Sequence, residues 1–387
     1  MTKTLFIACL VAVLPVTALA TSPLESPAKT FTVEQVDSYV ESLWKNYVAA
    51  EVELRKQEND RREIKLGERT MPFWYKVFGE KPAGGRSLFI SMHGGGSAPA
   101  SLNDNQYKNQ QKLYEPEEGV YFVPRAPTNT WNLWHEAHID DFFERVIENM
   151  VLLEDVNPNR VYIMGYSAGG DGVFQLAPRM ADRLAAAAMM AGHPNETTPD
   201  GLRNLPFTIH MGGRDGSFNR NKKAAEWKTM LADLNKQDPQ GYTHEVTIHE
   251  GLGHWVNRKD AVAVPWMAKF TRNISPQLVV WKQDDRTHNR FYWLAVSDEQ
   301  LKPRAVIRVR HDGQAFEVLH SDVSEFFIRV SDQMIDFDQE VIVKYNDQTL
   351  FRGQLTRSKA TIQKTFDERH DRTAVFSAEI QVKIPGE

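Results

Sequence analysis

Apolar residues recur every three or four positions after residue 31, which predicts one long amphipathic helix that extends to about Asp60. The residues that carry this period are Val36, Val40, Leu43, Tyr47 and Leu54. Thr32 and Gln35 have the spacing of a capping box, so we expect the helix to begin there. From Glu63 to Phe78 the pattern changes and indicates strands.

Further along the chain, short apolar runs alternate with stretches of helical period. The predicted strands are 87–92, 120–123, 161–164, 207–211 and 245–249. The predicted helices are 139–153, 171–183 and 222–234, and the segment between the first two strands is expected to be a loop. Strands that alternate with helices favour a doubly wound, mostly parallel sheet with helices on both faces, which is the α/β fold class.

Beyond Pro276 the helical period gives way to alternation of apolar and polar residues, which is typical of half-buried strands. The alternating sets are Ile307/Val309, Phe326/Ile328/Val330, Val341/Val343/Tyr345 and Ile380/Val382/Ile384. Asn346-Asp347 is a hairpin turn signal, and 358–368 is the one predicted helix. We therefore expect 276–387 to be a separate, mainly antiparallel domain that resembles a small β-sandwich.

The first twenty residues have the layout of a signal peptide. Lys3 provides the basic start, 5–16 is apolar, and Ala18-Leu19-Ala20 is a small-residue cleavage site. This stretch is too short for a stable membrane anchor, so we expect a secreted or periplasmic protein, with a buried N-terminal helix as the alternative. The only cysteine, Cys9, lies inside the signal, so the mature protein would have no disulfides.

These patterns divide the chain into a signal peptide (1–20), a lead-in with a helix (21–62), an α/β domain (63–275) and a β-rich domain (276–387). Composition changes this picture little, because 41% hydrophobic and 25% charged residues are ordinary for a globular protein of 387 residues. The net charge of −5 gives no reason to expect nucleic acid or an anionic membrane as a partner.

The chemistry begins at Gly165-Tyr166-Ser167-Ala168-Gly169, which directly follows the predicted strand that ends at residue 164. A serine between glycines, where a strand turns sharply into a helix, is typical of a nucleophile elbow. The turn strains the serine backbone and exposes its hydroxyl above the sheet edge. Ser167 is therefore the candidate nucleophile.

A serine hydroxyl needs a base that takes its proton and a carboxylate that orients the base. His254, in a glycine-rich loop after the last predicted strand of the α/β domain, is the predicted base. Asp215, in the turn after the preceding strand, is the predicted carboxylate, and the order Ser167, Asp215, His254 is that of hydrolases with such an elbow. His193 and Asp200 are weaker alternatives, because His193 precedes Asp215 and no strand leads into Asp200.

An oxyanion hole requires backbone N–H groups that can approach the developing negative charge. His93-Gly94-Gly95-Gly96 follows an early strand, and its glycines leave the backbone accessible. We expect the N–H groups of Gly94, Gly95 and Ala168 to form the hole, the last of them at the positive end of a helix.

With these segments the sequence resembles the α/β-hydrolase superfamily. From about residue 65 to 275 it is similar to secreted serine esterases of the polyhydroxybutyrate depolymerase and feruloyl esterase type. The segments that carry the resemblance are 91–96, 165–170, 211–215 and 253–255. The same parts recur in phospholipase/carboxylesterases and in serine peptidases of the prolyl-oligopeptidase type.

The resemblance makes 63–275 the catalytic domain. It implies a Ser-His-Asp esterase that forms an acyl-enzyme and acts on a small-molecule or polymer-attached ester, with no cofactor. A serine peptidase and a non-catalytic binding protein on a hydrolase scaffold remain the alternatives.

Substrate-binding residues are predicted from aromatic and histidine side chains near the motifs. These candidates are Trp131, Trp134, His135, His193 and Trp255, although the tryptophans could equally belong to the core. No metal is expected, because the two histidines of His135-Glu136-Ala137-His138 are three residues apart and not four.

The C-terminal domain offers a carbohydrate contact through Trp281, Tyr292 and Trp293. Packing of these aromatics in the core is the favoured alternative, because they alternate with apolar positions.

Overall fold

The structure of the protein is a computed structural model and describes residues 31–385. The predicted signal peptide, its cysteine and the lead-in up to residue 30 lie outside the described residues. Among residues 31–385, no helix combines the length and the apolar character that crossing a membrane requires.

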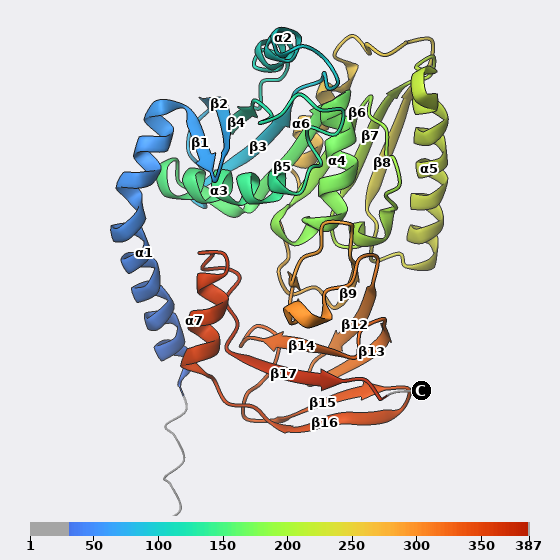
Figure 1. Ribbon diagram of the computed structural model, residues 1–387. Coiled ribbons are helices and arrows are strands. Elements are labelled where there is room, and N and C mark those ends of the chain that lie inside the picture. Colours follow the sequence, from blue (N-terminus) through green and yellow to red (C-terminus); the bar gives the residue numbers. More distant parts are fainter. Residues whose placement is uncertain (1–30, 386–387) are drawn as a thin grey trace, which may run out of the picture. The chain divides into compact units, whose positions relative to one another are not determined.

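An eight-stranded sheet, with strands between residues 63 and 249, forms the centre of the α/β region (Figure 1). Its strands follow the order β1-β2-β4-β3-β5-β6-β7-β8, and all neighbours from β4 to β8 run parallel. The bounds are β1 Glu63–Leu66, β2 Arg69–Phe78, β3 Arg86–Met92, β4 Gly119–Pro124, β5 Val156–Tyr166, β6 Ala186–Met190, β7 Phe207–Gly212 and β8 His244–His249. The predicted mostly parallel sheet is confirmed.

Helices cover both faces of this sheet. Successive side chains of a strand point to opposite faces, so neighbouring residues of β5 pack against different helices. In β5, Ile163 belongs to the buried cluster that α3, α4 and α5 complete, whereas Tyr162 and Met164 belong to a second cluster with α6. The bounds are α1 Val33–Arg61, α2 Ala100–Gln110, α3 His138–Leu153, α4 Ala168–Arg179, α5 Arg220–Gln237 and α6 Ala263–Met267.

Two of these elements correct the sequence prediction. The segment between β3 and β4 is not only a loop, because it contains α2, whose buried residues are Asn103 and Gln110. It shows no apolar stripe, so the helical period gave no signal. Strand β6 was also missed, because its sequence Ala-Ala-Ala-Met-Met lacks the β-branched residues that mark strands.

The C-terminal region contains a four-stranded sheet, β10-β11-β14-β17, and a five-stranded sheet, β16-β15-β13-β12-β9. All pairs are antiparallel except β13 with β15. The bounds are β9 Leu278–Lys282, β10 Arg290–Phe291, β11 Leu294–Ala295, β12 Val306–Asp312, β13 Ala315–Ser321, β14 Glu325–Val330, β15 Glu340–Tyr345, β16 Gln348–Gln354, β17 Ala378–Lys383 and α7 Lys359–Asp367. Asn346 and Asp347 have φ of 46° and 64° and form the predicted hairpin turn.

Aromatic side chains of the C-terminal region form its core. Trp281, Tyr292 and Trp293 are all buried, and the Trp293 ring lies 5.6 Å from the Phe316 ring of β13. A carbohydrate contact through these three rings is therefore wrong, because their faces are covered by protein. The packing alternative is correct.

Helix α1 contacts both regions. The predicted capping box at Thr32 and Gln35 is present, and Val36 and Leu43 pack with Ile362 and Phe366 of α7. At the other end of α1, the Glu58 carboxylate accepts hydrogen bonds from α3 at 2.8 and 2.9 Å. This long helix thus packs against α7 near its start and against α3 near its end (Figure 1).

Candidate active site

Ser167 lies at the sharp turn between β5 and α4. Its φ of 59° and ψ of −120° are strained for a residue with a side chain. The turn is crowded, since a Cβ added to Gly165 would lie 2.2 Å from the carbonyl oxygen of Gly169. Only glycine fits there, which explains the Gly-x-Ser-x-Gly pattern of the elbow.

Ser167, His254 and Asp215 are brought together at one edge of the sheet. They follow β5, β8 and β7, and parallel strands present their carboxyl ends at the same edge. Ser167 Oγ lies 3.0 Å from His254 Nε2, and His254 Nδ1 lies 2.7 Å from Asp215 Oδ2. Because an ionised carboxylate only accepts, Nδ1 donates to Asp215 and Nε2 is left to accept the serine proton.

Tyr166, the residue before the serine, holds the loop that carries the histidine. Its hydroxyl donates to the carbonyl oxygen of His254 and accepts the N–H of Val256 at 3.2 Å. The elbow and the His254 loop are therefore linked through the His254 and Val256 backbone as well as through the Ser167–His254 contact. Tyr166 is part of the elbow motif, but the motif alone does not indicate this contact.

The glycine-rich loop after β3 lies beside the serine. A Cβ added to Gly94 would be only 3.2 Å from Ser167 Cβ, and Gly94 and Gly95 line the cavity at the nucleophile. Ala168 begins α4 directly after the serine. Of the three predicted oxyanion-hole residues, Gly94 and Ala168 thus lie next to Ser167, and Gly95 lines the same cavity.

Hydrogen bonds of two buried side chains, His93 and Trp134, stabilise this loop. Burial lowers the pKa of His93 to about 4, so its ring is neutral near pH 7. Nδ1 donates to the Gly94 carbonyl oxygen at 2.6 Å, and Nε2 accepts the Ala126 N–H at 3.2 Å. The Trp134 indole N–H donates to the His93 carbonyl oxygen at 2.7 Å.

A cavity of about 430 Å³ adjoins Ser167. It is lined by Gly94, Gly95, Gln106, Asn109, Gln110, Leu113, Tyr166, Ser167, His254 and Trp255. Trp255 is half-exposed, as expected for a wall that a substrate touches. The contribution of α2 was missed, because a helix without an apolar stripe gave no reason to place it at the site.

The other predicted substrate residues do not line this cavity. The prediction for Trp134 is wrong, because its side chain is fully buried and supports the glycine-rich loop after β3 through the bond to His93. Trp131 is exposed and packs edge-on against half-buried His135, outside the cavity lining. The His193 ring accepts the Asn195 N–H at 2.9 Å.

Asp171, in the first turn of α4, has a structural contact. Its carboxylate accepts the backbone N–H of His193 at 2.6 Å, and burial raises the pKa of Asp171 to about 6. The weaker acid candidate Asp200 binds Thr198 and the Lys282 ammonium, the latter at 3.1 Å. Neither Asp200 nor His193 contacts the serine.

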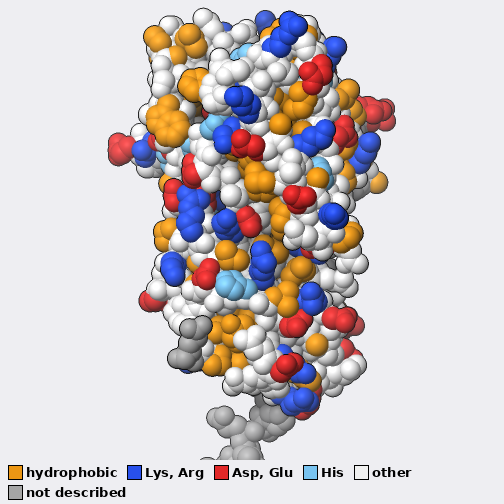
Figure 2. Space-filling model, turned by 90° about the vertical axis from the view of Figure 1, so that its right-hand side faces the viewer, with side chains coloured by type: hydrophobic (Ala, Val, Ile, Leu, Met, Phe, Trp, Pro, Cys, Tyr) orange, Lys and Arg blue, Asp and Glu red, His pale blue; other side chains and the backbone are white. Residues whose placement is uncertain are grey.

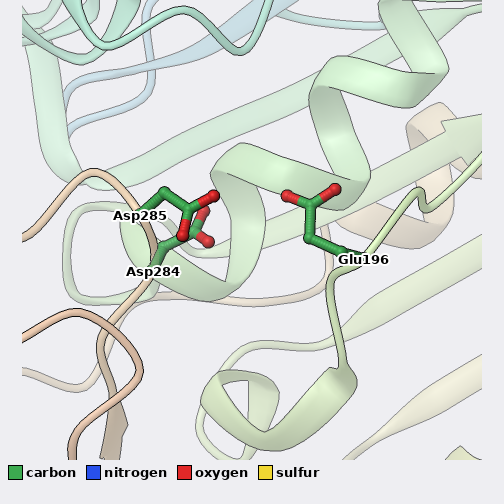
Figure 3. A group of neighbouring side chains, drawn as sticks. All are labelled: Glu196, Asp284 and Asp285. Carbon is green, nitrogen blue, oxygen red and sulfur yellow. The ribbon is translucent and has the colours of Figure 1, made fainter.

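Three acidic side chains come close together away from the triad (Figure 3). Asp284 and Asp285 lie on one segment and Glu196 on another, with oxygens within 4.8 Å of one another. Arg304 already binds this group, at 2.8 Å from each aspartate and 3.7 Å from Glu196. The cluster is therefore an ion-pair network around an arginine.

A larger hollow, of about 610 Å³, lies between α1, α3 and the segment before β17, and no triad residue lines it. Its charged side chains are paired, for example Arg183 with Asp371 at 3.1 Å and His370 with Glu148 at 3.0 Å. On the face drawn in Figure 2, lysines and arginines lie among aspartates and glutamates, with hydrophobic patches between them.

The comparisons with known proteins concern the segment that carries the triad. Residues 122–270 match the model of the dienelactone hydrolase family, an α/β-hydrolase family. No curated protein matches the chain. Sheet order, elbow and family match together give the protein the α/β-hydrolase fold.

Solved structures similar to the chain include a thermostable esterase (17% identity, 54% of this chain and 62% of that one, TM-score 0.43). A ferulic acid esterase is 14% identical over 52% of this chain and 91% of its own, with a TM-score of 0.35. Poly(aspartic acid) hydrolase-1 from Sphingomonas sp. KT-1 is 13% identical over 53% and 97%, with a TM-score of 0.39. The chain spans 62% of the length of the thermostable esterase, and such distant similarities carry no activity over.

Proposed function

We propose that the protein is a serine hydrolase that cleaves carboxylic esters through an acyl-enzyme. The observation that carries the proposal is the chain of contacts from Ser167 Oγ to His254, 3.0 Å, and from His254 to buried Asp215, 2.7 Å. The match to a hydrolase family over 122–270 supports it, because this segment contains all three residues.

In the first step His254 Nε2 takes the hydroxyl proton while Ser167 Oγ forms a bond to the ester carbonyl carbon. The carbonyl oxygen receives the π electron pair, and the N–H groups of Gly94, Gly95 and Ala168 are the candidate donors to this oxyanion. Asp215 stabilises the imidazolium that results. When the oxyanion collapses, the bond to the alcohol oxygen breaks and Nε2 protonates the leaving alcohol.

Water then repeats the cycle on the acyl-enzyme. His254 takes a proton from the water, whose oxygen attacks the acyl carbon, and the collapse returns that proton to Ser167 Oγ. The products are the carboxylic acid and the free enzyme. Export by the predicted signal peptide would place this activity outside the cytoplasm.

The test compares an ester with the matching amide. Purified protein is assayed with 4-nitrophenyl acetate and 4-nitroacetanilide, beside the variant Ser167→Ala, with circular dichroism as the check of folding. We expect the ester to be cleaved faster, and Ser167→Ala to lose on the order of 1,000-fold or more in rate. Full ester turnover by Ser167→Ala would overturn the proposal, and faster cleavage of the amide would favour the peptidase alternative.

A further inference from the structure

Helix α2 is unusually rich in carboxamides, since six of the nine residues 103–111 are Asn or Gln. Two of them bind the helix to β3 and to the glycine-rich loop that follows β3. Asn103 accepts the Gly96 N–H at 2.9 Å, and buried Gln110 donates to the Ser91 hydroxyl at 2.7 Å. These anchors fix the position of the helix relative to Ser167.

Two further carboxamides face the cavity at the serine. Gln106 and Asn109, three residues apart on one face of α2, line it together with Leu113 of the turn that follows the helix. Gln106 Oε1 lies 3.8 Å from the point that a Gly94 Cβ would occupy, and Ser167 Cβ lies 3.2 Å from that same point. The carboxamide of Gln106 and the Ser167 side chain therefore both lie beside Gly94.

Two aromatic side chains also line the cavity. The rings of Tyr166 and Trp255 lie 5.6 Å apart at 52°, and Trp255 is 50% exposed. Such a wall suits the apolar face of a small group, while the carboxamides offer both donors and acceptors to its polar edge.

No Asp, Glu, Lys or Arg side chain lines the cavity, within the part of the chain that the structure describes. A charged group that entered it would lose hydration without gaining a partner of opposite charge. A purely alkyl group would instead leave the carboxamides without the hydrogen bonds that water gave them.

We propose that this cavity selects esters in which the group beside the scissile bond is uncharged and carries hydroxyl groups. Gln106 and Asn109 bind the hydroxyls, and the apolar face of the group packs on Trp255. The inference rests on the proposed ester hydrolysis and names the substrate class of that site.

The test uses acetates of three alcohols of similar size: glycerol, propan-1-ol and lactate. Because the cavity adjoins both Gly94 and His254, the acyl side is tested in parallel with 4-nitrophenyl esters of glyceric, butanoic and succinic acids. We expect kcat/KM for the hydroxylated ester to exceed that for the alkyl ester about tenfold in one series, with the carboxylate ester poorest.

Matched variants locate the preference. The double variant Gln106→Leu/Asn109→Leu should lower the ratio of hydroxylated to alkyl kcat/KM about tenfold. Asn105→Leu alters an exposed carboxamide of α2 outside the cavity lining, so it should keep the wild-type ratio. Absence of a hydroxyl preference in both series, or a preference that survives in the double variant, overturns the inference.

The two proposals fail separately. If Ser167→Ala abolishes turnover of every ester while wild type prefers the carboxylate ester, only the inference about the cavity is wrong. If Ser167→Ala retains turnover, the proposed function itself is wrong.

Discussion

Two aspartate–histidine pairs of this protein have the same contact distance but different surroundings, and the aspartates bind different ring nitrogens, Nδ1 of His254 and Nε2 of His288. Asp215 and His254 are 2.7 Å apart, as are Asp140 and His288, and both aspartates are buried. The second nitrogen of His254 faces the Ser167 hydroxyl beside an uncharged cavity. The distance between a buried aspartate and a histidine therefore does not by itself distinguish a candidate base from a structural ion pair.

The Asp140–His288 pair belongs to a network of ions. Arg179 of α4 donates to Asp140 of α3 at 2.5 Å and lies 3.4 Å from Asp284 in the C-terminal region. Burial alone would raise the pKa of Asp140, but the Arg179 guanidinium keeps this pKa below its usual range. The network joins the α/β region to the C-terminal region, so we expect it to act on stability and not on turnover.

The same substitution in both pairs gives the sharpest contrast. Asp215→Asn should lower kcat for an ester on the order of 10,000-fold, because an amide cannot hold the imidazole in the tautomer that accepts the serine proton. The free energy of unfolding should change far less than in the matched Asp140 variant. Ester kinetics and urea denaturation measure the two effects, and near-normal kcat in Asp215→Asn would contradict the assignment.

Asp140→Asn should lower the free energy of unfolding by about 3–5 kcal/mol, because it leaves buried Arg179 without its closest counter-charge. The folded enzyme should keep a kcat close to that of wild type. Urea denaturation followed by fluorescence measures the loss. If Asp140→Asn had the same free energy of unfolding as wild type, the ion network would not explain the difference between the two aspartate–histidine pairs.

Asp171 is a partly buried aspartate, which accepts a backbone N–H from His193 and whose pKa is raised to about 6. A raised carboxyl pKa favours the fold below about pH 4, and this contribution is lost as the pH rises through 6. Asp171→Asn cannot ionise, so it should raise the free energy of unfolding at pH 8 by about 1–3 kcal/mol. The difference should vanish near pH 4, and an equal effect at both pH values would exclude ionisation as its cause.

Tyr166→Phe removes the hydroxyl that binds the backbone of the His254 loop. We expect kcat to fall about tenfold, or about 1.4 kcal/mol, with little change in KM, since the two hydrogen bonds of this hydroxyl position the predicted base. Tyr162→Phe is the control, because its hydroxyl also donates to a backbone carbonyl, that of Phe270, away from the triad. Equal losses in both variants would mean that Tyr166 supports only the fold.

The alternation of strands and helices along the chain was enough to predict the α/β sheet and to predict that Ser167, Asp215 and His254 lie close together. Each of the three follows a parallel strand, and the carboxyl ends of such strands share one edge. The Ser167 elbow added a local signal, because its backbone geometry requires the flanking glycines.

The walls of the cavity could not be predicted in this way. Helix α2 is held by hydrogen bonds of Asn103 and Gln110 and not by an apolar stripe, so the sequence shows no hydrophobic period that would predict a helix there. Trp134 was expected at the substrate, but whether an aromatic faces a ligand or supports a loop depends on contacts far apart in the chain. The role of Tyr166 likewise depends on a contact across 88 residues.

The most direct test of the central claim is covalent labelling of the nucleophile. Folded protein is treated with a fluorophosphonate, digested, and analysed by mass spectrometry, with Asp140→Asn and Asp215→Asn beside wild type. We expect one phosphonyl group on Ser167 in wild type and in Asp140→Asn, and strongly slowed labelling in Asp215→Asn. An unlabelled Ser167 in folded wild type, or equal labelling rates in all three proteins, would contradict it.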